Sequence, residues 1–241
     1  MYIRSSTTNC ADNVLESFCT ACNKYGVPSR VRADHGNENM LVGVLMNVLR
    51  GTNRGSFITG RSVHNQRIER LWRDVHKEVT QSLYVKFYDM EDAGKLQTDN
   101  DIHRLALRTV FLPILNDRLS QFATAWNSHR IRTAHNNTPN QLWVAGMVNA
   151  QSGSQTVANE LLEGHNSTLH ERVMQKLAEL GVDTSDAADD PIPRNSQEAI
   201  SLTTEQQDEL QATIGSISDV NEKFDTCITK LNEILQQNVH D

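Results

Sequence analysis

Residues 1–84 alternate short runs of strand-forming residues with longer stretches whose apolar positions recur every three or four residues. This pattern predicts strands at 1–5, 30–33 and 55–59, and helices at 12–25, 38–49 and 63–84. Asp12 is expected to cap the first of these helices, and Gly26 followed by Pro28 is expected to end it. Alternation of strands and helices is typical of an α/β domain, which is the fold class that we expect for residues 1–150.

The rest of the chain is predicted to be helical. The apolar pattern indicates helices at 102–126, with a bend near Pro113, at 139–148 and at 169–180. Thr138 and Pro139 are residue types that begin a helix, whereas Gly181 ends one. An acidic linker with prolines follows at 183–195. We therefore expect three parts: a core at 1–150, a helix and linker at 151–200, and a final helix at 201–238.

The final helix carries a heptad pattern. Its apolar positions alternate spacings of four and three residues through Leu210, Ile214, Ile217, Asn221, Phe224, Ile228, Leu231 and Leu235. This spacing is typical of a coiled coil, in which one polar residue such as Asn221 sets the register. The pattern predicts a homo-oligomer formed through residues 210–235. The alternative is a single amphipathic helix that folds back on its own domain.

Charge is distributed unevenly along the chain. Residues 1–150 hold 18 Lys and Arg against 13 Asp and Glu, a net +5, whereas residues 151–241 hold 5 against 17, a net −12; the sum is the overall −7. The basic first part is compatible with binding to nucleic acid. The negative overall charge hides this difference between the two parts of the chain. The sequence predicts neither a signal peptide nor a membrane span. The lone Cys19-x-x-Cys22 pair is expected to pack in a helix. These features predict a nuclear or cytoplasmic protein.

Two carboxylates occupy positions suited to a metal site. Asp34 ends the predicted strand at 30–33, and Glu69 lies early in the helix that follows the next strand. A strand end and a neighbouring helix can bring such groups together at the carboxyl edge of a sheet. Carboxylate oxygens are the ligands that Mg²⁺ prefers.

The residues around these acids resemble a known family. The segments SRVRADHGNEN and GRSVHNQRIERLWRDVHKEV place 34 residues between Asp34 and Glu69, and WNSHRIRTAHNNTPNQLW follows later. Together they resemble the catalytic core of retroviral-type (DDE) integrases, as in the integrase-core proteins encoded in animal genomes. The resemblance covers residues 1–150.

The resemblance implies a ribonuclease-H-like fold in which three carboxylates hold two Mg²⁺ or Mn²⁺ ions for phosphoryl transfer on DNA. By that likeness Asp34 is the second acid and Glu69 the third. Residues 1–5 match the third strand of the family, so the first acid has no counterpart here. We therefore expect an integrase core that lacks its first two strands, is truncated at its amino terminus and is catalytically inactive.

Basic residues surround Glu69, and they are the candidates for DNA contact: Arg61, Arg67, Arg70, Arg73 and Lys77. Such a cluster neutralises phosphates and gives weak, salt-dependent binding. The alternative is an ordinary solvated helix face, with a pair such as Arg70–Asp74.

Three functions remain open at this point. The first is an inactive integrase-like protein that retains DNA binding. The second is a protein-interaction module that self-associates through its last helix. The third is an active polynucleotidyl transferase whose first Asp is supplied by an upstream segment.

Overall fold

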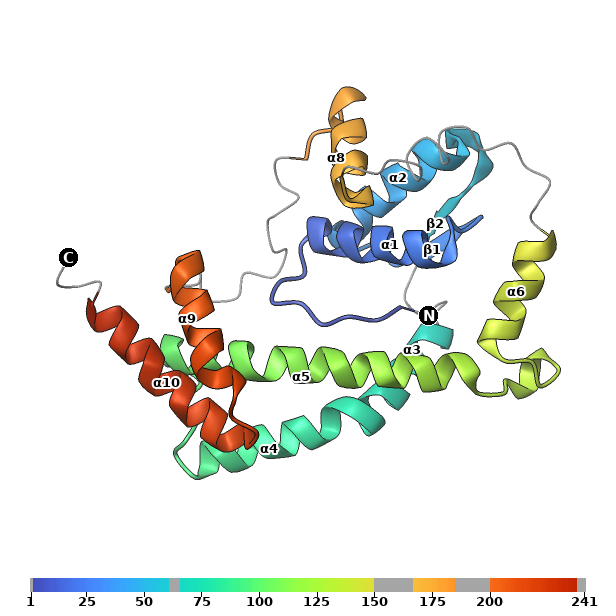
Figure 1. Ribbon diagram of the computed structural model, residues 1–241. Coiled ribbons are helices and arrows are strands. Elements are labelled where there is room, and N and C mark those ends of the chain that lie inside the picture. Colours follow the sequence, from blue (N-terminus) through green and yellow to red (C-terminus); the bar gives the residue numbers. More distant parts are fainter. Residues whose placement is uncertain (1, 61–65, 150–166, 185–199, 238–241) are drawn as a thin grey trace. The chain divides into compact units, whose positions relative to one another are not determined.

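The computed structural model describes residues 2–60, 66–149, 167–184 and 200–237, which form two compact units (Figure 1). The sheet unit combines Met1–Asp74 with Ser120–Pro193, and the helical unit combines Val75–Leu119 with Arg194–Asp241. Helix α5 (Asp101–Ser128) begins in the helical unit, continues through Pro113 and ends in the sheet unit. The boundary expected at residue 150 lies outside the described residues, so the three-part division stays a prediction.

The sheet unit contains two parallel strands, β1 (Val31–Ala33) and β2 (Phe57–Thr59), paired with Val31 opposite Phe57. Both strands lie where the sequence predicts them. A short 3₁₀ turn, η2 (Thr52–Arg54), precedes β2. The Phe57 ring lies against helix α2 (Met40–Arg50), where a Cβ added at Gly43 would come within 2.8 Å of the ring. Gly43 therefore allows the helix to approach the sheet closely.

The amino-terminal residues follow helix α1 (Ala11–Tyr25) and do not form a strand. Arg4 pairs with Glu16 at 2.9 Å, and the Asn13 side chain donates to the Thr8 hydroxyl at 2.5 Å. The strand predicted at 1–5 is therefore wrong over the described residues 2–5. Asp12 is not the cap either, because α1 begins one residue before it.

Three helices enclose the core of the sheet unit: α1, α2 (Met40–Arg50) and α8 (Leu169–Glu179). All three were predicted, and a 3₁₀ turn, η1 (Asn37–Asn39), leads into α2. Helix α8 begins with a capping box between Thr168 and Glu171. Their buried residues form one apolar cluster that includes Leu15, Cys19, Leu41, Leu45, Met46, Val173 and Leu177. Helix α8 is therefore part of this core, although it lies far along the chain.

The buried thiols of Cys19 and Cys22 confirm that this pair packs in a helix. Burial raises the pKa of both thiols from 9.0 to about 12, and it does the same for Cys227 in the helical unit. Because the folded state disfavours the thiolate, each buried, protonated thiol stabilises the fold. This stabilisation is fully present below pH 9. It is lost as the pH rises from about 9 towards 12, by about 1.4 kcal/mol per pH unit for each thiol.

We expect these three cysteines to resist alkylation by iodoacetamide in the native protein at pH 8, and to react rapidly in urea. Peptide mass spectrometry after timed labelling measures each site separately. Rapid native labelling of Cys19 or Cys22 would show that α1 is not packed as described.

Helix α6 (Pro139–Asn149) starts with the cap predicted from its sequence. The Thr138 hydroxyl accepts from the Gln141 N–H at 3.2 Å, and the Gln141 side chain accepts from the Thr138 N–H at 2.8 Å. The helix is tied to the end of α1, because the Trp143 indole donates to the Tyr25 carbonyl at 3.0 Å.

The helix predicted at 63–84 is divided into three parts. Helix α3 (Gln66–Val75) is followed by the π-helix η4 (His76–Thr80) and by α4 (Gln81–Asp92), and the change of unit falls between Asp74 and Val75. Val75 and Val79 are buried, as an apolar stripe requires. Ile68 and Trp72 in the first half are exposed, so the stripe does not extend along the whole segment.

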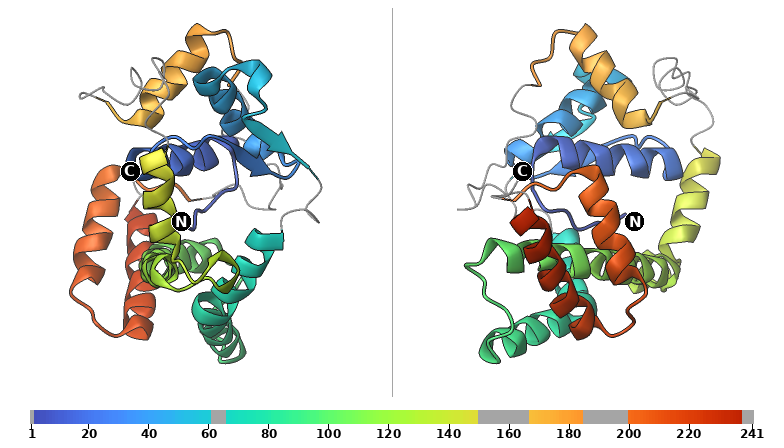
Figure 2. Two further views of the ribbon diagram at one scale, coloured as in Figure 1. Left: turned by 90° about the vertical axis from the view of Figure 1, so that its right-hand side faces the viewer. Right: turned by 60° about the vertical axis from the view of Figure 1, so that its left-hand side comes forward.

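The helical unit packs α4 and α5 against α9 (Thr204–Gly215) and α10 (Val220–Gln237). The last two lie side by side as a hairpin, which both views of Figure 2 show. The core of the helical unit contains Phe111 from α5 and Phe224 from α10, whose ring centres lie 6.1 Å apart. Around them are Leu83, Met90, Ala106, Val110, Leu210, Ile214, Cys227 and Leu231.

The continuous helix expected over 201–238 is therefore wrong. The chain turns after Gly215, and the Asp219 carboxylate accepts from the N–H groups of Asn221 and Glu222 to begin α10. Asn221 is exposed and accepts from the Lys86 ammonium at 2.7 Å. Leu210, Ile214, Phe224 and Leu231 of the heptad are buried within this unit, as in the fold-back alternative, whereas Ile217, Ile228 and Leu235 are half-buried.

No helix in the described parts of the chain is both long enough and apolar enough to span a membrane.

Candidate nucleic-acid interface

Asp34 follows β1 directly, at the carboxyl end of the strand. Its exposed carboxylate accepts from the Asn39 side-chain amide at 3.0 Å, and the same amide donates to Glu38 at 3.4 Å. Asn39 thus bridges two carboxylates. The Glu38 carboxyl lies directly over Gly36, where an added Cβ would collide with it. A Cβ at Gly36 would displace this carboxyl, which can swing aside because it is the end of a flexible side chain, and the Gly36 backbone, with φ −74°, is one that any residue adopts.

Glu38 is a residue that the sequence reasoning missed. The signal was present, because Asp34, Gly36 and Glu38 alternate along one short loop that leads into a helix. The Glu38 carboxylate is half-buried and packs against the backbone of Gly36, whereas Asp34 is exposed. Glu38 therefore has a more structural role than Asp34.

Glu69 lies on α3 and is exposed to solvent. It makes no hydrogen bond or ion pair with the described part of the chain. Across residues 2–60, 66–149, 167–184 and 200–237, no three His, Cys, Asp or Glu side chains are placed to share a metal ion. Asp34 and Glu69 therefore do not form a three-carboxylate centre with a described residue, and the residues described do not fit a two-metal site.

The basic residues of α3 are Arg67, Arg70 and Arg73, each three positions from the next, and all are exposed. Residues three apart are neighbours on a helix surface, and like charges at this spacing destabilise an isolated helix. None of the three has an ion pair within the described residues, and the alternative pair Arg70–Asp74 is not formed there. The helix thus presents three exposed arginines without an ion pair, and with its own Glu69 and Asp74 it carries a net charge of +1.

The other two predicted basic residues differ. Arg61 lies outside the described residues. Lys77 belongs to the π-helix of the helical unit and pairs with Glu78 at 3.4 Å, with both side chains well exposed.

A second basic segment of the sheet unit follows α5. A tight turn closes where the Ile131 N–H donates to the Asn137 carbonyl, with the 3₁₀ helix η5 (Arg132–Ala134) inside it. His135 and Asn136 have positive φ angles of 54° and 60°. Arg130 and Arg132 are exposed there. The sequence reasoning used this segment only for its family likeness and did not identify it as a basic surface.

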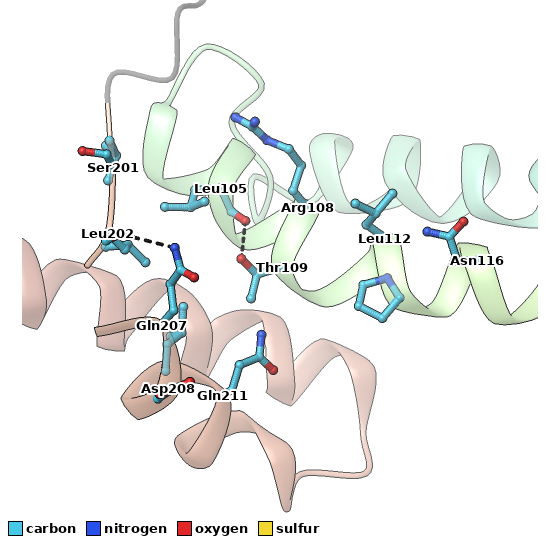
Figure 3. A pocket seen from close by; sticks show the side chains of 13 residues that line it. Leu105, Arg108, Thr109, Leu112, Asn116, Ser201, Leu202, Gln207, Asp208 and Gln211 are labelled. Atoms are coloured by element: carbon cyan, nitrogen blue, oxygen red, sulfur yellow. Dashed lines mark hydrogen bonds between the residues drawn. The ribbon is translucent and has the colours of Figure 1, made fainter. Parts of the chain in front are cut away.

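The helical unit has a groove of about 580 Å³ between α5 and α9 (Figure 3). Arg108 and Thr109 line one side, and Gln207 and Gln211 line the other. Pro113 has no N–H, so the Thr109 carbonyl lacks its usual helical donor at this wall. With Asp208 as the one carboxylate among its lining residues, the groove has no paired acids for metal chemistry.

The integrase core domain family matches residues 1–157. The chain therefore belongs to the integrase core domain family. No curated protein and no solved structure matches it. The family implies a ribonuclease-H-like α/β fold, interaction with DNA and use of divalent metal ions. The two parallel strands and the helices beside them agree with the α/β class. Helices α8, α9 and α10 lie outside the matched residues.

Proposed function

We propose that this chain is an integrase-family core that binds DNA phosphates through the exposed face of α3, and that by itself it does not cut or join DNA. The observation that carries the first half is the row formed by Arg67, Arg70 and Arg73, whose charges have no acidic partner among the described residues. Arginine contacts to phosphate position a protein on DNA without reading its sequence. Binding of this kind releases counterions and weakens steeply with salt.

The second half rests on the acids. Phosphoryl transfer by two metal ions requires carboxylates that converge on both ions. Asp34 is held by Asn39 and Glu69 has no described partner, so the described residues supply two separate acids. In the alternative of an active enzyme, a further acid comes from a segment outside these 241 residues.

Self-association through residues 210–235 is the other candidate. Leu210, Phe224 and Leu231 are at most 2% exposed because they pack inside the helical unit. Few apolar positions of the heptad are then left to contact a second chain. We therefore favour DNA binding over self-association as the function.

Fluorescence anisotropy with a labelled DNA duplex tests the proposal across a range of salt concentrations. Three phosphate contacts predict a slope of about −3 in a plot of log affinity against log salt. In the same preparations, Mg²⁺ or Mn²⁺ is expected to produce no joined or nicked DNA. Binding that is independent of salt would contradict the first half. Joining that disappears in Glu69→Gln would contradict the second.

A further inference from the structure

Helix α4 carries an exposed apolar face in addition to the face that packs in the helical unit. Leu83 and Met90 belong to the core of that unit. Tyr84 and Val85 are each 55% exposed, and Tyr88 is 63% exposed. Because residues one turn apart lie on the same side of a helix, these three side chains form one continuous patch on the side away from the core. We call them the tyrosine patch.

The contacts of the two tyrosines differ from those of a core aromatic residue. Phe87, one position before Tyr88, packs edge-on against Phe111 with ring centres 4.9 Å apart. The Tyr84 ring meets only the edge of the His76 ring among the described residues, at 5.8 Å. Tyr88 makes no hydrogen bond or ring contact with a described residue. Contiguous exposed apolar side chains, unlike single ones, are typical of a surface that binds another molecule.

Carboxylates continue the same face towards the end of α4. Asp92 lies one turn after Tyr88, Asp89 lies one turn after Val85, and both acids are exposed. Neither forms an ion pair with a described residue. The helix contains one Lys against three Asp and Glu, a net charge of −2, and its last turn has no basic residue. Since the end of a helix is the negative pole of its dipole, a positive charge is favoured there.

Aromatic rings beside unpaired carboxylates indicate a cationic ligand. Lys and Arg side chains can lay their apolar stems on a ring while the charged head reaches a carboxylate. DNA would be repelled by Asp89 and Asp92. A purely apolar partner would remove both carboxylates from water without giving them a partner, which is costly.

The length of the face indicates a polymer. From Tyr84 to Asp92 the helix rises about 12 Å, at about 1.5 Å per residue. An extended polypeptide covers this length with about four residues, at about 3.3 Å each. A peptide with several basic residues can therefore contact both tyrosines and both acids at once.

We propose that this face of α4 binds a basic polypeptide segment of another protein, with Lys or Arg stems on Tyr84 and Tyr88 and their charged heads at Asp89 and Asp92. The inference goes beyond the proposed function and does not depend on it. The arginines of α3 belong to the sheet unit, whereas this face belongs to the helical unit.

Fluorescence anisotropy of the full chain with a labelled peptide of alternating Arg and Gly tests the tyrosines. We expect Tyr84→Ser with Tyr88→Ser to weaken binding about 5- to 30-fold, since each ring contributes a factor of about two to five. The net charge is unchanged, so long-range attraction does not explain such a loss. Tyr84→Phe with Tyr88→Phe keeps both rings and is expected to retain binding. Met40→Ser with Leu180→Ser removes two other exposed apolar side chains, in the sheet unit, and is expected to have no effect.

A second pair of variants tests the acids. Asp89→Asn with Asp92→Asn is expected to weaken binding of the same peptide about 2- to 30-fold, and the loss is expected to shrink as salt is added. Asp208→Asn with Asp225→Asn makes the same change in net charge at exposed positions of α9 and α10. We expect this control to weaken binding much less.

Several results would overturn the proposal. They are an absence of peptide binding at low salt, full binding by Tyr84→Ser with Tyr88→Ser, and an equal loss in Met40→Ser with Leu180→Ser. Displacement of the peptide by spermine at equal positive charge would show that any cation suffices. Sedimentation that reveals an oligomer, lost in the tyrosine variant, would make a second copy of this chain the occupant instead.

Circular dichroism melting shows whether each variant is folded. DNA binding is expected to be the same in the tyrosine variant as in the unmodified chain. Failure of this inference therefore leaves the proposed function standing, and failure of DNA binding leaves this inference standing.

Discussion

Exchanging both Arg70 and Arg73 for glutamate is expected to weaken DNA binding by roughly 60-fold at about 0.1 M salt. Each phosphate contact contributes about 0.9 to the slope of log affinity against log salt, which is roughly an eightfold change in affinity at that concentration. Loss of two contacts multiplies the two roughly eightfold losses in affinity, and it reduces the steepness of the salt dependence by about 2. The new carboxylates add repulsion, so the stated factor is a lower bound. Anisotropy titrations at several salt concentrations measure both the affinity and the slope.

Net charge must be controlled, because a chain four charges more negative repels DNA at long range. Lys24→Glu with Lys95→Glu makes the same change in net charge at exposed positions outside α3. We expect this control to reduce affinity only slightly and to leave the salt slope unchanged. An equal loss in both double variants would mean that DNA does not contact the arginines of α3.

The Phe224→Ala variant is expected to lower the free energy of unfolding of the helical unit by about 3–5 kcal/mol. The ring is completely buried and lies against Phe111 and His103, with ring centres 6.1 and 6.2 Å away. Its removal leaves a cavity at the point where α10 meets α5. Urea unfolding measures the loss, and labelling of Cys227, one turn further along α10, reports opening of the same core. Asp225→Ala, at the neighbouring exposed position, is expected to change little.

The same experiment separates the helical hairpin from a coiled coil between chains. If Phe224 packs within its own unit, the urea midpoint is independent of protein concentration. If it belongs to a seam between two chains, mass action raises the midpoint as the protein is concentrated. A midpoint that rises over about a hundredfold range in concentration would contradict the hairpin.

The candidate site was only partly predictable from sequence. Asp34 and Glu69 were identified because a strand end and the start of a helix are local features, and the family likeness fell on the same residues. Glu38 was missed because its relation to Gly36 and Asn39 depends on how the loop folds. The arginines of α3 were recognised as basic, but whether Asp74 compensates Arg70 depends on side-chain placement, which composition does not determine.

Local chemistry was sufficient to predict β1, β2, α1, α2, α6 and α8. Their boundaries depend on interactions within a few residues, such as the caps at Thr138 and Thr168 and the glycine that follows α1. The sequence by itself therefore determined where most of these elements begin and end, and which faces of them are apolar.

The tertiary structure decided which apolar faces meet. A heptad pattern is satisfied equally by a partner chain or by other helices of the same chain, because each alternative buries the same side chains. The turn after Gly215 and the cap at Asp219 bring Leu210 and Phe224 into one core with α4 and α5. In the same way, the apolar face of α8 packs against α1, more than a hundred residues away. Such long-range choices depend on the total burial achieved by the whole fold, and no short stretch of sequence contains that information.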